Sequence, residues 1–340
     1  MKPIPCLLIS LSPLLAQTPS VEEVLSLACT RSPSLAVALD KSLKADDVRA
    51  GTAYLAKGPD FLFVVEAASE PALRINDEPG PRMAKLDGSS DRWVASAKLP
   101  ASRTHNFHYL IGGKPFGGRN DVMAYGEYHY LKPGVPEGKL TSKMSHTSRI
   151  YDGMAADYWV YVPAQYRPGV PIAVMFWTDG EVHINRDSGS RAMNVWDNLT
   201  YEKKIPAMLQ VLVSPGTKDG QRWRSIQYDS VDDRFARYVL EEILPEVGKA
   251  YSLRSDGYSR AIAGDSSGAI CALNAAWWRP EEFSRVLLRI GQLHQYPVAA
   301  ARQRRAYRQR RRPHFPLLDP QIAAQEHSCL YAGRLWRFRE

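Results

Sequence analysis

Gly264-Asp265-Ser266-Ser267-Gly268 is the stretch that decides the fold of this chain, because its flanks predict a strand before it and a helix after it. The apolar residues 261–263 have the character of a buried strand end, and residues 269–278 predict a helix. A sharp turn between the two strains the backbone of its middle residue and projects that side chain at the edge of a sheet. Gly264 and Gly268 lack a Cβ, so neighbouring backbone can pack closely against them. Ser266 is therefore the candidate nucleophile, and the alternative is an ordinary strand-to-helix turn.

The composition is that of a folded protein with room for two domains. Its 340 residues are 44% hydrophobic and 24% charged, which is typical of soluble globular chains. The N-terminus differs, because Lys2 precedes a mostly apolar run over residues 4–16. This pattern predicts a signal peptide over residues 1–17 and a secreted or periplasmic protein that has no membrane attachment after cleavage. No other run approaches the length that spans a membrane.

The four cysteines are too few to form a disulfide scaffold for a chain of this size. Cys6 lies in the predicted signal peptide, and Cys271 lies on the helix after Ser266, where we expect a buried thiol. No spacing of cysteines and histidines indicates a zinc site, so we assign no metal and no cofactor.

The net charge of +8 is concentrated at the C-terminal end. Residues 292–340 contain ten Arg, no Lys and three acidic residues, a net charge of +7, which leaves +1 for the rest of the chain. The basic run over residues 302–312 is compatible with binding to nucleic acid or to a membrane surface. A slip of the reading frame near Gly291 is a different explanation for these arginines.

Residues 18–135 are expected to form a helical leader over 18–50 and a small β-sandwich over 51–135. Short alternating runs at residues 61–65, 93–97 and 107–111 predict strands, and turn residues separate them. Several short, regularly punctuated strands indicate an immunoglobulin-like sandwich. The proline and glycine residues between 131 and 138 suggest a linker.

Residues 140–291 show a different pattern, in which strands alternate with helices. Apolar runs at 158–162, 172–176, 208–213 and 286–290 predict strands, and residues 233–251 have helical spacing. Such alternating units build a mainly parallel sheet with helices on both faces, which is the α/β class.

The segment Trp177-Thr178-Asp179-Gly180 closes an earlier strand of this sheet. Catalytic groups in such sheets gather at the carboxyl ends of strands, where Ser266 also falls. Backbone N–H groups of Gly180 and Ser267 are candidates for an oxyanion hole, in which one donor stabilises the transition state by about 3 kcal/mol. The alternative is that Asp179-Gly180 is only a tight turn.

In combination, these segments resemble the enterochelin-esterase-like group of the α/β-hydrolases over residues 61–291. The resemblance depends on the order of the segments 177–180, 224–229, 240–245 and 264–268. It implies an α/β-hydrolase fold, often preceded by an immunoglobulin-like domain, and hydrolysis of siderophore, sugar or phenolic esters. It also implies that Ser266 attacks the ester carbonyl, that a His accepts its proton and that an Asp orients the His. A small-molecule or glycan ester is the partner that this family implies.

The chain departs from the family pattern after Gly291. The resemblance implies that the triad Asp and His lie on loops after two further strands, whereas 49 residues remain. Asp319 and His327 come in the expected order, but no strand precedes Asp319, and residues 313–320 contain three prolines. His294 and His314 are no better candidates. His183, near Asp179, is expected to be a solvated loop histidine, and the alternative is a residue that lines the pocket. We therefore assign no triad Asp or His in this chain.

A single-base frame slip near Gly291 accounts for the tail. If each codon is rebuilt from the last two bases of one residue's codon and the first base of the next, residues 292–299 can spell Ser-Phe-Thr-Ser-Ile-Arg-Trp-Arg. In the same offset, residues 315–327 can spell Phe-Arg-Phe-Leu-Ile-Arg-Lys-Ser-Pro-His-Lys-Asn-Ile. Residues 328–336 can spell Arg-Val-Cys-Met-Gln-Asp-Gly-Ser-Gly, a strand-like run ending in Gln-Asp-Gly. The arginines then reflect codons translated out of frame, and the basic run no longer indicates nucleic-acid binding.

These observations predict a serine carboxylic ester hydrolase that this chain carries in an impaired form. Without its base, Ser266 retains at most the contribution of the oxyanion hole, and the strand at 286–290 presents an unpaired apolar edge. The alternative is a secreted, non-catalytic glycan-binding protein whose hydrolase domain has decayed. The oligomeric state is left open by the sequence.

Overall fold

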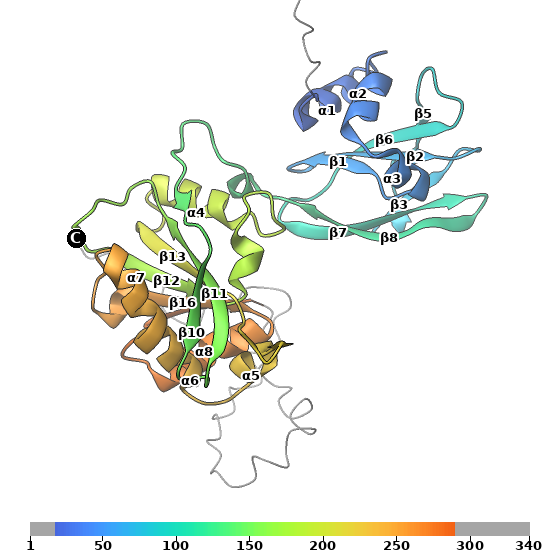
Figure 1. Cartoon of the computed structure of the whole chain (residues 1–340). Helices are drawn as coiled ribbons and strands as arrows, with labels where there is room; N and C mark the ends of the chain where they lie inside the picture. The colour runs from blue at the N-terminus through green and yellow to red at the C-terminus, as the bar shows by residue number, and fades with distance from the viewer. Residues whose placement is uncertain (1–17, 290–340) are drawn as a thin grey trace, which may run out of the picture. The chain divides into compact units, whose positions relative to one another are not determined.

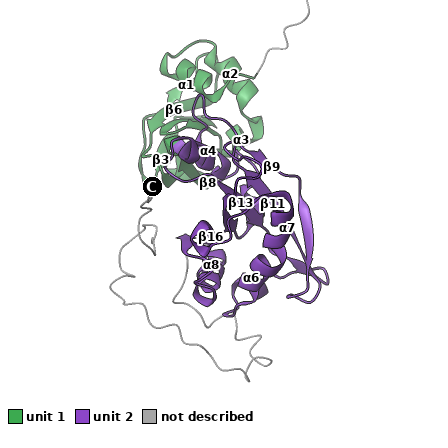
Figure 2. Ribbon diagram, turned by 90° about the vertical axis from the view of Figure 1, so that its left-hand side faces the viewer, with its two compact units in different colours: residues 1–127 green, residues 128–340 purple. Residues whose placement is uncertain are grey.

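The computed structural model describes residues 18–289. The chain divides into two compact units between Glu127 and Tyr128 (Figures 1 and 2). The predictions made for residues 1–17 and 292–340, including Asp319 and His327, lie outside the described residues. Within residues 18–289, no helix is both long and apolar enough to cross a membrane.

The first unit contains two four-stranded sheets. One has the order β1-β2-β6-β5 and the other has the order β4-β3-β7-β8, and every pairing is antiparallel. Phe61, Phe63 and Val65 alternate along β2 and share a buried core with Phe107 and Tyr109 of β7. The bounds are β1 Tyr54–Lys57, β2 Asp60–Glu66, β3 Ala72–Ile75, β4 Glu78–Pro79, β5 Ala84–Lys85, β6 Arg92–Lys98, β7 Arg103–Ile111 and β8 Lys114–Ala124.

Three helices cover the other face of the first sheet. The intervening residues of β2, Leu62 and Val64, are fully buried in a second core with side chains of α1 (Val21–Cys29), α2 (Leu35–Ser42) and α3 (Ala45–Ala50). Ser20 and Glu23 form a capping box that fixes the start of α1. The helical leader is therefore an integral layer of the first unit, and residues 61–65 of β2 are all apolar because both of its faces are covered.

The second unit is built on one nine-stranded sheet whose main path runs β15-β14-β11-β13-β12-β16-β17, with β9 and β10 also paired to β11. Along the main path, the pairs β13–β12, β12–β16 and β16–β17 are parallel. All pairings of β9, β10, β11, β14 and β15 are antiparallel. The predicted mainly parallel sheet is therefore mixed. The bounds are β9 Lys139–Leu140, β10 Met144–Ser148, β11 Met154–Val162, β12 Ala173–Trp177, β13 Met208–Val213, β14 Thr217–Lys218, β15 Gln221–Arg222, β16 Arg260–Asp265 and β17 Arg285–Arg289.

Helices pack on both faces of this sheet, as predicted. Leu209, Val211 and Val213 of β13 face the larger core, while Leu212 faces a core shared with Trp196 of α4. The helical region predicted at 233–251 contains a π-helical segment, Tyr238–Ile243, after which the Leu244 N–H donates to the Val239 carbonyl five residues earlier. The helices are α4 Ala192–Tyr201, α5 Arg224–Tyr228, α6 Arg234–Arg237, α7 Leu244–Ala250 and α8 Ser267–Trp278.

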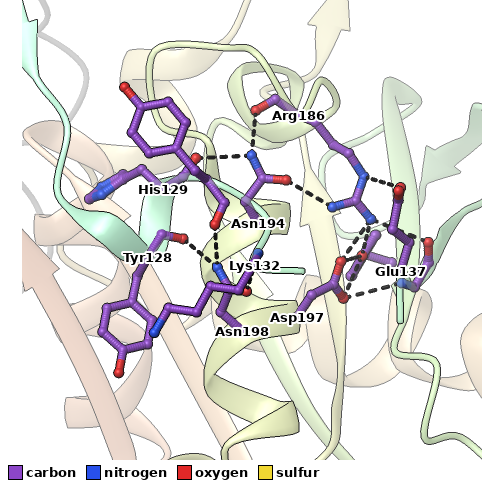
Figure 3. A network of polar contacts seen from close by, with 11 residues as sticks. Tyr128, His129, Lys132, Glu137, Arg186, Asn194, Asp197 and Asn198 are labelled. Atoms are coloured by element: carbon purple, nitrogen blue, oxygen red, sulfur yellow. Dashed lines mark hydrogen bonds and ion pairs between the residues drawn. The ribbon is translucent and has the colours of Figure 1, made fainter. Parts of the chain in front are cut away.

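The segment predicted as a linker is bound to one face of α4 (Figure 3). Asn198 donates to the carbonyls of Tyr128 and Tyr130 at 2.9 and 2.7 Å and accepts the N–H of Lys132 at 3.0 Å. The buried carboxylate of the preceding residue, Asp197, accepts the N–H of Gly138 at 3.2 Å. Residues 128–138 therefore belong to the second unit, and the division between the units falls before the predicted linker.

Candidate active site

Ser266 occupies the turn between β16 and α8 in a conformation that few non-glycine residues adopt. Its φ of 53° and ψ of −124° lie outside the common regions for L-residues, and Ser266 is exposed. The turn is held because the Ser266 N–H donates to the Arg289 carbonyl at 3.0 Å and the Ser266 carbonyl accepts the Ala269 N–H at 3.0 Å. The predicted continuous strand-to-helix bend is present, and the serine stands at its apex.

Gly264 and Gly268 make the turn possible because their backbones touch. A Cβ on Gly264 would lie within 2.5 Å of both the Gly268 carbonyl oxygen and Thr178 Oγ1. A Cβ on Gly268 would overlap with the same Thr178 hydroxyl. Gly264 is thus required by close approach of the Gly268 backbone, and Gly268 by close approach of the Thr178 side chain, in keeping with the spacing around Ser266.

Replacing Gly264 with alanine is expected to destabilise the second unit by about 3 kcal/mol, because the new methyl group meets backbone atoms that cannot move independently of the turn. Thermal unfolding followed by circular dichroism should show the loss. The matched control is Gly248→Ala on α7, where the nearest atom to a new Cβ is Leu253 Cδ1 at 3.9 Å. That variant should be neutral or slightly more stable, since alanine favours helix. Equal melting temperatures for the two variants would contradict the close-packing argument.

The loop after β12 lies directly beside the Ser266 turn. Thr178 donates to the Ala263 carbonyl through its N–H at 3.0 Å and its hydroxyl at 3.3 Å, which ties the loop to β16. Asp179 has a left-handed backbone, with φ 51° and ψ 44°, and Gly180 begins the 3-10 turn Gly180–His183. Gly180 is buried against the β13 backbone, where a Cβ would lie within 2.5 Å of Val213 N. The segment is therefore more than a tight turn, because it is fixed to two strands.

Two candidate donors for an oxyanion hole begin helical turns. Ser267 is the first residue of α8, and Gly180 is the first residue of the 3-10 turn. The first N–H groups of a helix have no acceptor within that helix, so both can bind an anion. The neighbouring N–H of Asp179 is already used, since it donates to the Tyr228 hydroxyl at 2.9 Å.

Arg224 and Tyr228 fix Asp179 from α5. The Arg224 guanidinium forms a bidentate ion pair with Asp179, with N–O distances of 2.6 and 2.7 Å, and lies 5.1 Å from the centre of the Tyr228 ring. Hydrogen bonding to Asp179 raises the pKa of Arg224, and complete burial raises the pKa of Tyr228 well above its usual value. Arg224 is therefore charged and Tyr228 neutral at physiological pH. Residues 224–229 carry part of the family resemblance, but no role was predicted for Arg224 and Tyr228, although a spacing of four residues places both side chains on one helix face.

His183 is buried, so the expectation of a solvated loop histidine is wrong. Its Nδ1 lies 2.9 Å from Ser190 Oγ, and its ring packs edge-on against Trp177 with centroids 5.1 Å apart. Burial lowers the pKa of His183, which keeps it neutral at pH 7. Within residues 18–289, neither His183 nor any other side chain is hydrogen-bonded to the Ser266 hydroxyl, and no group of three or more His, Cys, Asp or Glu residues could hold a metal ion.

One family model matches most of the second unit. Residues 154–311 match the family model described as "Esterase: Putative esterase", and the match begins at the first residue of β11. This confirms the predicted resemblance to enterochelin-esterase-like proteins.

Similar solved structures include ferric enterobactin esterase from Salmonella typhimurium, with 16% identity over 70% of this chain and 74% of that chain and a TM-score of 0.47. The enterobactin esterase FES from Shigella flexneri gives 15% identity over 72% and 75%, with a TM-score of 0.46. The CE1 ferulic acid esterase AmCE1/Fae1A from Anaeromyces mucronatus gives 20% over 48% and 61%, with a TM-score of 0.40.

Proposed function

We propose, from the match of residues 154–311 to a family model of putative esterases, that Ser266 is the nucleophile of a carboxylic ester hydrolase. The observation that carries the proposal is the exposed serine in a strained turn between a parallel strand and a helix. Strain of this kind persists only where the surrounding structure enforces it, and here two contacting glycines and three backbone hydrogen bonds do so.

The geometry supports a separate role for each of these residues in acyl transfer. The Ser266 hydroxyl attacks the ester carbonyl, and the N–H groups of Ser267 and Gly180 stabilise the negative charge that develops on the carbonyl oxygen. Arg224 and Tyr228 act as positioning residues, because their bonds to Asp179 fix the loop that carries the Gly180 N–H. The acyl–oxygen bond of the ester then breaks, the alcohol leaves with the proton given up by the serine hydroxyl, and the acyl group remains on Ser266. Water hydrolyses this acyl-enzyme in a second step, which releases the carboxylic acid and restores the hydroxyl.

We propose further that the proton-accepting His and its Asp are absent from this chain, so that its activity is impaired. The support is that no described side chain is bonded to the Ser266 hydroxyl, together with the restored-frame reading of residues 292–336. The proposed substrates are siderophore-type, sugar or phenolic esters. Secretion is proposed from the apolar run at residues 4–16.

We also propose that the first unit has an immunoglobulin-like fold. Its strand orders correspond to A-B-E-D and C′-C-F-G in the lettering of that fold.

Covalent labelling tests the identity of the nucleophile. An alkyl fluorophosphonate, which mimics the tetrahedral intermediate, is expected to form an adduct on the peptide that contains Ser266, detected by mass spectrometry. The chain with its frame restored after Gly291 should react much faster than this chain, because a base then removes the hydroxyl proton.

Two serine variants serve as the matched pair for this experiment. Ser266→Ala should abolish the adduct, whereas Ser267→Ala should keep it, since only the backbone N–H of Ser267 takes part. Labelling that survives Ser266→Ala at the same rate would remove Ser266 from the mechanism.

A further inference from the structure

A cavity of about 480 Å³ lies at the amino ends of the strands that carry the candidate active site at their carboxyl ends. Its apolar wall includes Ile172, Val174 and Met208, at or near the start of β12 and β13. Ligand pockets in proteins commonly enclose about 300–1,000 Å³ and combine an apolar wall with a few polar groups. The cavity therefore has the size and the lining of a small-molecule site.

The cavity also carries an excess of positive charge. Four arginines line it, whereas Asp256 is its one acidic residue. The Asp256 carboxylate accepts the N–H of Ser259 at 2.9 Å and its hydroxyl at 3.1 Å, so its main partner is the turn Gly257–Ser259. Within residues 18–289, Arg167 and Arg254 are exposed and form no ion pair within 4 Å. Desolvation raises the pKa of Asp256, but the hydrogen bonds from Ser259 and, to a smaller extent, the charge of Arg254 lower it below its usual value. Arg254 nevertheless forms no ion pair with Asp256. Both guanidinium groups therefore keep N–H donors for an anion.

Arg260 adds a buried donor. It is the first residue of β16 and is 9% exposed. One of its nitrogens donates to the Ser255 carbonyl at 2.7 Å and another pairs with Glu282, but its buried Nε has no hydrogen-bond partner among the described residues. A buried donor left without an acceptor destabilises a fold by about 1–3 kcal/mol, and a bound ligand can remove that penalty. Gln165, which also lines the cavity, has an unpartnered buried Oε1.

We propose that this cavity binds a small organic carboxylate with an apolar body. Guanidinium groups match the planar carboxylate and bind it with two parallel hydrogen bonds, while the apolar wall and the rings of Tyr166 and Tyr258 cover the rest of the ligand. The site is distinct from Ser266, because β16 runs from Arg260 to Asp265 and a strand of that length spans about 17–20 Å. The proposal is independent of ester hydrolysis.

Calorimetric titration of the full chain with sodium 1-naphthoate tests this site. We expect saturable binding of one naphthoate per chain and no comparable binding of neutral 1-naphthylmethanol, which has the same ring system. Arg254→Ala and Arg167→Ala should each weaken naphthoate binding by about tenfold or more, since each removes a charge-assisted hydrogen bond. Both side chains are exposed, so neither change should unfold the chain.

Two controls separate this site from the surface and from the candidate active site. Arg149→Ala removes another exposed arginine of the second unit that does not line the cavity, and it should leave the affinity unchanged. Ser266→Ala should also leave it unchanged. The proposal is overturned if naphthoate does not bind, if the neutral alcohol binds equally well, or if binding depends on Ser266 rather than on Arg254 and Arg167. Preference for 1-naphthyl phosphate over naphthoate would overturn the assignment to carboxylates.

Discussion

Restoring the reading frame after Gly291 is expected to raise the rate of ester hydrolysis by about 10³-fold or more. In the described structure the Ser266 hydroxyl stands at a formed turn, and two candidate N–H donors are in place, yet no described base is bonded to it. A serine hydroxyl is a weak nucleophile until a base removes its proton. The frame-restored sequence would supply the strand after Gly291 and a Gln-Asp-Gly segment of the kind that the family resemblance assigns to the triad Asp.

The measurement is kcat/KM for a chromogenic acyl ester with both proteins under the same conditions. A chain that stops at Gly291 is the matched control, because it lacks the tail without gaining a triad, and it should be as slow as the unchanged chain. Equal rates for the restored and the unchanged chain would refute the frame-slip hypothesis. The circular dichroism spectra of all three proteins should be compared, so that loss of folding is not mistaken for loss of chemistry.

Folding and catalysis are linked in this prediction through β17. Among residues 18–289, no strand pairs with the free side of β17, and its Val286 and Leu287 are half-buried. An unpaired apolar edge is a template for association with another chain. We therefore expect the restored strand to improve solubility as well as activity.

The Ser266 turn could be predicted from sequence because its main signals are local. The strand before it is apolar, the helix after it is regular, and Gly264 is in close contact with the Gly268 backbone four residues later, although Thr178 also constrains both glycines. Strand β2 was found for a related reason, since both of its faces are buried and the whole run is apolar.

Features that depend on distant partners could not be predicted in the same way. α4 was not predicted because its buried side includes Asn194, Asp197 and Asn198, which bind backbone far away in the sequence and so break the apolar pattern of a buried face. His183 looked like a loop residue because the aromatic rings that bury it come from other elements. The antiparallel pairings in the sheet of the second unit were not predicted, because an apolar run does not indicate the direction of its strand.

Ser266→Ala is expected to lower kcat/KM for an acyl ester by about 10⁴-fold or more in the frame-restored chain. In the unchanged chain the same substitution should have an effect of less than about tenfold. The reason is that a nucleophile and its base act as one unit, so that removing the second member after the first is already lost changes little. The four proteins thus form a double-mutant cycle whose coupling term measures whether Ser266 and the restored residues act together.

Ser267→Ala is the neighbouring control in both backgrounds, because it removes a side chain and leaves the proposed N–H donor in place. It should alter the rate far less than Ser266→Ala in the restored chain. A large effect of Ser266→Ala in the unchanged chain would mean that a base in that chain already accepts the proton of the Ser266 hydroxyl. It would contradict the proposed loss of the triad. A small effect in both chains would mean that ester hydrolysis, where observed, does not pass through an acyl group on Ser266, because a serine that carries the acyl group cannot be replaced without loss of the step that forms it.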